Sequence, residues 1–194
     1  IWGSNREDIF AVGQRGTILH FDGEQWTQQV SGTEADLTGV WGSGPNDVFA
    51  VGSRGAILHF DGHHWSTMAH SPPEGWQLFH PNQTEEISFS AVWGSGPDNV
   101  FAVGSHGAIL HFDGRHWRAQ QSAVRVTLHD IWGSGPDNVF AVGSYGQVIR
   151  FDGERWRREL PTAPCGAMVV TGTATDDVIA AGRQGGMWRF DGQE

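Results

Sequence analysis

The 194-residue chain is poor in cysteine, in basic residues and in long apolar stretches. Its single cysteine, Cys165, excludes a disulfide within the chain. No run approaches the roughly 18 apolar residues of a membrane-spanning helix, and we expect no membrane insertion. Lysine and arginine total 12 against 22 acidic residues, which gives a net charge of −10. Because nucleic acids require a basic face, we expect no nucleic-acid partner.

Signatures of catalysis are also missing. The sequence has no phosphate-binding glycine loop, no nucleophile elbow and no H-E-x-x-H pattern. His20, His59 and His111 recur at one position of successive units, which places them on separate sheets and not around one ion. We therefore predict no catalytic residues, no metal site and no cofactor.

What the chain has in abundance is repetition. Units that begin near residues 1, 40, 92, 131 and 170 carry W-G-S, then D/N-V-F-A-V-G, then F-D-G-x-x-W. The period is 39 residues, apart from 13 extra residues in the second unit, within 66–90. The fifth unit lacks the opening tryptophan and stops early. Since repeats share one continuous core, residues 1–194 are predicted to form a single domain.

Each unit contains four strand-like segments. In the fourth they span 126–132, 139–142, 148–151 and 156–160, rich in β-branched and aromatic residues and separated by turn residues. Four-stranded antiparallel sheets of about 40 residues are typical of propeller blades. We predict an all-β propeller of five recognisable blades with incomplete ends: the first lacks the beginning of its inner strand and the fifth its outer strand. Either a three-stranded blade closes a five-bladed ring, or an oligomer or a longer chain completes it.

The repeated motifs resemble known propeller families. The F-D-G-x-x-W turn resembles a shortened Asp-box of sialidase-type propellers, and the whole unit resembles the W-G-S-G-x-x-D-V-F-A-V-G propeller repeats of bacterial, often secreted, proteins. This resemblance implies an extracellular or periplasmic location. It implies no activity, because the Asp-box of those families lies away from the active site. The sequence shown carries no signal peptide.

The repeated aspartates and tryptophans are predicted to be structural. We expect each aspartate of F-D-G to hydrogen-bond its own turn, as in Asx-turns. The outer tryptophans, together with the tryptophans of W-G-S, are expected to pack between blades and to contribute burial energy. The outer set is Trp26, Trp65, Trp117 and Trp156.

Two features are candidates for ligand contacts. One position in the loop between the second and third strands varies inside an otherwise repeated frame, as Arg15, Arg54, His106, Tyr145 and Gln184. The 13-residue insertion adds Trp76, Phe79 and His80 on the same expected face. The alternatives are a loop tip that tolerates any residue and an insertion that only covers the edge of its blade.

These features favour a non-catalytic binding module. A glycan would use aromatic stacking and the polar tips, whereas a protein partner would use Trp76 and Phe79 as anchors. The alternatives are a glycoside hydrolase or lyase of propeller type and a purely structural repeat domain of a larger secreted protein.

Overall fold

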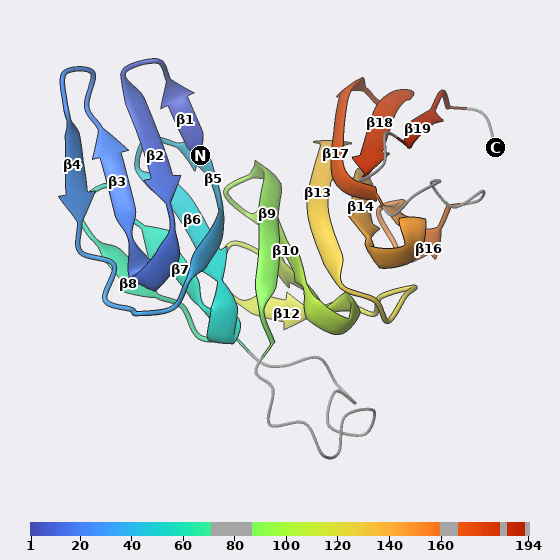
Figure 1. The fold of residues 1–194 in the computed structure, drawn as a ribbon, viewed down its shortest axis with the longest axis horizontal. Helices are drawn as coiled ribbons and strands as arrows, with labels where there is room; N and C mark the ends of the chain where they lie inside the picture. Colours follow the sequence, from blue (N-terminus) through green and yellow to red (C-terminus); the bar gives the residue numbers. More distant parts are fainter. Residues whose placement is uncertain (71–86, 160–166, 183–185, 193–194) are drawn as a thin grey trace.

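The computed structural model describes residues 1–70, 87–159, 167–182 and 186–192, which form five antiparallel sheets (Figure 1). The first contains β1 (Trp2–Asn5), β2 (Asp8–Val12), β3 (Ile18–Phe21) and β4 (Trp26–Gln29). The second contains β5 (Leu37–Gly44), β6 (Asp47–Gly52), β7 (Ile57–Phe60) and β8 (Trp65–Thr67). The third contains β9 (Phe89–Gly96), β10 (Asn99–Gly104), β11 (Ile109–Phe112) and β12 (Trp117–Ala119). The fourth contains β13 (Leu128–Gly135), β14 (Asn138–Gly143), β15 (Gln147–Phe151) and β16 (Trp156–Arg158). The fifth contains β17 (Ala167–Ala174), β18 (Asp177–Gly182) and β19 (Met187–Phe190).

Each sheet pairs its strands in chain order, and the sheets follow one another along an arc whose ends are the first (blue) and fifth (red) sheets (Figure 1). The second strands explain why the sheets pack face to face. In β6, Val48, Phe49, Ala50 and Val51 are all fully buried, so the sheet is apolar on both faces. The prediction of an all-β propeller is confirmed. None of the described segments is a helix long and apolar enough to cross a bilayer.

The tryptophan of W-G-S packs on a glycine of the next sheet at every junction between neighbouring sheets, and this glycine belongs to W-G-S in all but the fifth sheet. A Cβ built on Gly94 would lie 2.6 Å from Cη2 of Trp41 in the preceding sheet. Glycine is therefore required where the indole of the preceding sheet rests on the backbone. The same contact recurs at the other junctions, as Trp2 on Gly42, Trp93 on Gly133 and Trp132 on Gly172. The tryptophans of W-G-S therefore pack between blades, as predicted.

A second contact between sheets joins aromatic rings further out. The ring centroid of Phe49 in β6 lies 5.3 Å from Phe112 and 5.9 Å from Trp117 of the third sheet. Trp65, Trp117 and Trp156 are correspondingly 7%, 3% and 5% exposed, as predicted. The prediction is wrong for Trp26, which is 46% exposed. Its face of the first sheet has no preceding sheet against it in the described part of the chain.

The strand boundaries correct one detail of the sequence analysis. The first strand of the fourth unit is predicted to end at residue 132, but Gly133-Ser134-Gly135 continues β13, with Gly133 paired to Val139 and Gly135 to Asn138. The indole of Trp93 in the preceding sheet covers Gly133 of this strand. The expected incompleteness at both ends is confirmed within the described residues: β1 has four residues where β5 has eight, and the fifth sheet has three strands.

Candidate functional site

The turns between second and third strands share one unusual conformation. They are the 3-10 turns η1 (Gln14–Gly16), η2 (Ser53–Gly55), η3 (Ser105–Gly107) and η4 (Ser144–Gly146). Their middle residues all have positive φ: Arg15 (51°), Arg54 (56°), His106 (58°) and Tyr145 (61°). Bulky residues rarely adopt this left-handed conformation, and it costs about 1–3 kcal/mol. The structure thus gives these four predicted site residues equivalent positions on successive blades.

Hydrogen bonds fix η2, η3 and η4 to the chain that enters the same sheet. Ser53 N donates to Asp36 O at 2.8 Å, and Asp36 N donates to Ser53 Oγ at 2.9 Å. Ser105 and Ser88 form the same reciprocal pair in the third sheet, at 2.9 and 3.0 Å. The turn tips therefore belong to a rigid frame and are not free loops.

The link that leaves the first sheet also crosses its turn. Arg15 N donates to Asp36 Oδ1 at 2.8 Å, and Gly16 N donates to Ala35 O at 2.8 Å. A Cβ on Gly16 would lie 2.0 Å from Thr33 O, so the residue after the tip must be glycine. The turns and the links between sheets thus lie on one face, as expected. We call it the turn-tip face and define it by Arg15, Arg54, His106 and Tyr145.

The side chains of the turn-tip face differ in exposure. Tyr145 is 84% exposed, Arg15 and Arg54 are exposed, and His106 is half-buried. Within the described residues, neither Arg15 nor Arg54 forms an ion pair with a carboxylate, in contrast to Arg118, Arg157 and Arg189. Among the described residues, the two guanidinium groups therefore have no carboxylate bound to them.

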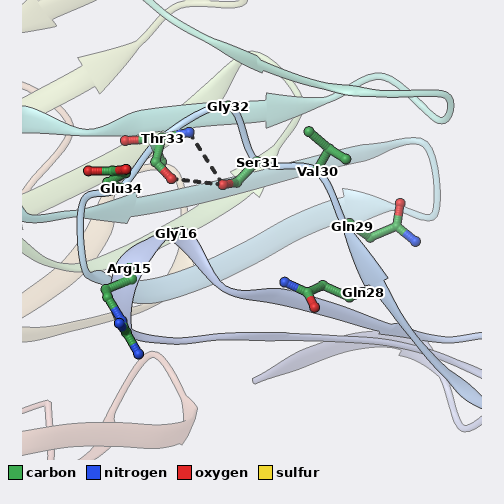
Figure 2. Close-up of a pocket in the computed structure, with 9 residues that line it drawn as sticks. All are labelled: Arg15, Gly16, Gln28, Gln29, Val30, Ser31, Gly32, Thr33 and Glu34. Atoms are coloured by element: carbon green, nitrogen blue, oxygen red, sulfur yellow. Dashed lines mark hydrogen bonds between the residues drawn. The ribbon is translucent and has the colours of Figure 1, made fainter.

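A hollow of about 600 Å³ adjoins Arg15 and opens to solvent (Figure 2). Figure 2 shows the end of β4 on one side and the link to the second sheet on the other. The link is held in shape because Ser31 Oγ donates to Thr33 O at 3.2 Å and Ala35 N donates to Thr33 Oγ1 at 3.1 Å. The lining is mostly amide, hydroxyl and charged: Arg15, Gly16, Gln28, Gln29, Val30, Ser31, Gly32, Thr33 and Glu34.

The opposite face carries the other turns and is rich in carboxylates. In the first four sheets, the aspartate of F-D-G accepts hydrogen bonds from two backbone amides of its own turn, as Asp61 does from His63 and His64 at 2.9 Å. These amides lower the pKa of Asp22, Asp61, Asp113 and Asp152. The predicted structural role of these four aspartates is confirmed. We call this surface the carboxylate face; its acidic turn residues are Glu7, Asp22, Glu24, Asp61, Asp98, Asp113, Asp137, Asp152, Glu154, Asp176 and Asp191.

A repeated polar cluster was missed by the sequence analysis. In the first sheet, the side chains of Ser4 and His20 both donate to the carboxylate of Asp8, with His20 Nε2 2.6 Å from Oδ1. The same residue types form a nucleophilic triad in hydrolases, but there the serine bonds to the histidine. Here the carboxylate lies between them. The available signal in the sequence was the spacing of Ser4, Asp8 and His20, which recurs in the second unit as Ser43, Asp47 and His59.

The later sheets keep this cluster with other residue types. Asn99 and Asn138 stand in place of the aspartate, and Arg150 in place of the histidine, with Arg150 Nε donating to Asn138 Oδ1 at 2.7 Å. The cluster ties the third strand to the turn between the first two.

Burial shifts the pKa of two further groups. Asp130 in β13 has a raised pKa because burial disfavours its charge, and its Oδ2 accepts a 2.9 Å bond from Val170 N of the fifth sheet. Burial lowers the pKa of His111, whose Nε2 lies 2.6 Å from Asn99 Oδ1. Both groups join strands, and across the described ranges no three His, Cys, Asp or Glu side chains cluster as metal ligands.

Four of the predicted ligand contacts lie outside the described residues. They are Trp76, Phe79, His80 and Gln184. Their part in any site stays a prediction.

Comparison with solved structures shows the fold. YCF48 from Cyanidioschyzon merolae superposes with a TM-score of 0.68 at 18% identity, over 96% of this chain and 63% of that one. U3-55K superposes with a TM-score of 0.72 at 10% identity, over 93% and 57%. Both are β-propellers, and this chain spans less than two thirds of their length. At such low identity the likeness establishes architecture alone.

A structure of YCF48 bound to a D1 peptide aligns over 98% of this chain and 92% of that one, but with a TM-score of 0.46 at 14% identity. A similarity this low supports no argument about partners. No protein-family model matches the sequence, and no curated protein matches it.

Proposed function

We propose that this propeller is a non-catalytic binding module that holds a segment of a protein partner on its turn-tip face. The observation that carries the proposal is the left-handed conformation of Arg15, Arg54, His106 and Tyr145. Glycine would fit each position without strain, yet each holds a large side chain that can donate hydrogen bonds or stack. Strain maintained at equivalent positions of a rigid frame is typical of functional sites.

Charge indicates the chemistry of the partner. The chain carries a net charge of −10, and many of its acidic residues lie in turns of the carboxylate face. An acidic peptide would be repelled there and attracted to Arg15 and Arg54, whose guanidinium groups bind carboxylates with two parallel hydrogen bonds. Tyr145, 84% exposed, supplies an aromatic surface for an apolar side chain of the same segment.

Selection from a random peptide library against the purified chain tests this proposal. We expect acidic peptides to be enriched and to lose binding to the variant R15A/R54A/H106A/Y145A. The matched control R115A/R155A removes two exposed arginines from the turns of the carboxylate face and should retain binding. Peptides that bind both variants equally would contradict the proposal.

A glycan is the second candidate, favoured by the hollow beside Arg15. Gln28, Gln29 and Ser31 provide the amide and hydroxyl groups that hydrogen-bond sugar hydroxyls. A glycan array probed with the wild type and with Gln28→Ala separates the candidates. If the wild type binds a glycan, and if Gln28→Ala weakens this binding and free sugar competes with it, the ligand is a glycan and not a protein segment. If no glycan on the array is bound, the outcome of the peptide selection decides whether the partner is a protein segment.

A further inference from the structure

The first sheet presents an uncovered copy of a surface that is buried in its neighbours. We call it the receiving face and define it by Gly3, Ile9, Leu19, Phe21 and Trp26. The equivalent side chains of the second sheet are Val48, Leu58, Phe60 and Trp65, which are 0%, 0%, 7% and 7% exposed. On the first sheet Trp26 is 46% exposed, and Ile9, Leu19 and Phe21 are only half-buried.

The contacts at the other junctions show what covers such a face. At each one, an indole from the inner strand of the preceding sheet rests on the glycine at the W-G-S position, as Trp2 does on Gly42. A phenyl ring from the second strand of the preceding sheet packs on the outer aromatic pair, as Phe10 does on Phe60 and Trp65, at 5.3 and 5.8 Å.

Gly3 lacks that partner. The atoms nearest to a Cβ built on Gly3 are Asp8 O, Asn5 O and Ile9 Cγ1, at 2.9, 3.1 and 3.1 Å, all from its own sheet. The receiving face therefore has the glycine that accommodates an indole and the aromatic pair that accommodates a phenyl ring, and none of the described residues supplies either ring.

The exposed face of the fifth sheet does not supply these rings. Thr171 stands in β17 where Trp132 stands in β13, and Ile179 stands in β18 where Phe140 stands in β14. A second copy of this chain, docked through its fifth sheet, would leave the space over Gly3 unfilled. The two ends of the arc are therefore not complementary to each other.

We propose that the receiving face binds a further blade of the W-G-S type, one that presents a tryptophan from its inner strand and a phenylalanine from its second strand. The docking geometry is the one repeated at the four junctions within the chain. The indole of the incoming blade covers Gly3, and its phenyl ring packs on Phe21 and Trp26.

The test converts the fifth sheet into the missing blade surface. The donor chain carries T171W/I179F, together with W26E so that it cannot bind itself; the wild type serves as the receiver. Sedimentation velocity should show a 1:1 complex of donor and wild type. The complex should be lost when the receiver carries W26E and retained when it carries V30E, because Val30 is 87% exposed but lies on the link outside the receiving face.

Circular dichroism confirms beforehand that each variant is folded. Two outcomes would overturn the proposal. The first is a donor that forms no complex with the wild type, or one that also binds the W26E receiver. The second is self-association of the wild type that W26E abolishes. The fifth sheet, with Thr171 and Ile179, would then be sufficient to cover the receiving face without the two rings.

Discussion

Substituting the outer tryptophans one at a time should separate the first sheet from the others. Trp117 is 3% exposed, lies 5.3 Å from Phe112 and 5.9 Å from Phe49 between ring centroids, and donates from Nε1 to Met68 Sδ at 3.4 Å. Trp26 is 46% exposed and lies 5.4 Å from Phe21, a residue of its own sheet. The two residues have the same place in the repeat and different surroundings.

The expected magnitudes follow from burial. A fully buried tryptophan removes roughly 150–250 Å² from water, about 4–6 kcal/mol at 25 cal/mol/Å². Measured losses for Trp→Ala in protein cores are about 3–5 kcal/mol. Because almost half of Trp26 stays in water, Trp26→Ala should cost about half as much as Trp117→Ala. For a chain of this size the difference of about 2 kcal/mol corresponds to roughly 4–8 °C in Tm.

Urea unfolding followed by circular dichroism measures both losses. Trp65→Ala and Trp156→Ala serve as matched controls, because these tryptophans of the second and fourth sheets are 7% and 5% exposed. Both variants should lose as much stability as Trp117→Ala. Equal losses for Trp26 and Trp117 would refute the argument, because they would require the first sheet to be covered as fully as the third.

Three further predictions concern packing and pH. Gly94→Ala should cost about 1–3 kcal/mol by overpacking, since its Cβ would lie 2.6 Å from Trp41; Gly96→Ala, with its nearest atom at 3.7 Å, should be nearly neutral in the same urea assay. Asn99→Asp should raise the pKa of His111, which burial lowers in the wild type. The variant should therefore gain stability relative to the wild type as the pH falls below about 6.5. An NMR titration that leaves the His111 pKa unchanged would contradict this. The folded pKa is lowered in four turn aspartates, Asp22, Asp61, Asp113 and Asp152. The stability that they contribute is therefore complete above their unfolded pKa of about 3.9 and is lost as the pH falls through the lower folded value. Acid unfolding curves of single Asp→Asn variants measure this loss.

The sequence predicts the fold because period, strand pattern and turn residues are all local properties. It also predicts the variable tips, since Arg54 and His106 stand out between nearly identical units. Local patterns do not give the contacts between sheets. The reason for glycine at Gly94 becomes visible only when Trp41 of the preceding sheet lies on it, and the exposure of Trp26 depends on what stands beside the first sheet.

The polar clusters were missed for a related reason. Asp8 and His20 are twelve residues apart and meet only because β2 and β3 pair in register, Phe10 opposite His20. The left-handed tips were likewise hidden, because the sequence marks a tight turn with glycine but does not say which neighbouring residue shares its conformation. Both features become predictable once the register of one sheet is known, since the units repeat it.

The one-way packing of each tryptophan on the next glycine also has a consequence for synthesis on the ribosome. A sheet that has just emerged exposes its indole and phenyl rings until the next unit of 39 residues is complete. At about 5–20 residues per second this takes roughly 2–8 s. Chaperones and off-pathway contacts can therefore bind only one end of the growing arc. The 13-residue insertion after the second sheet prolongs the exposure of that sheet's rings.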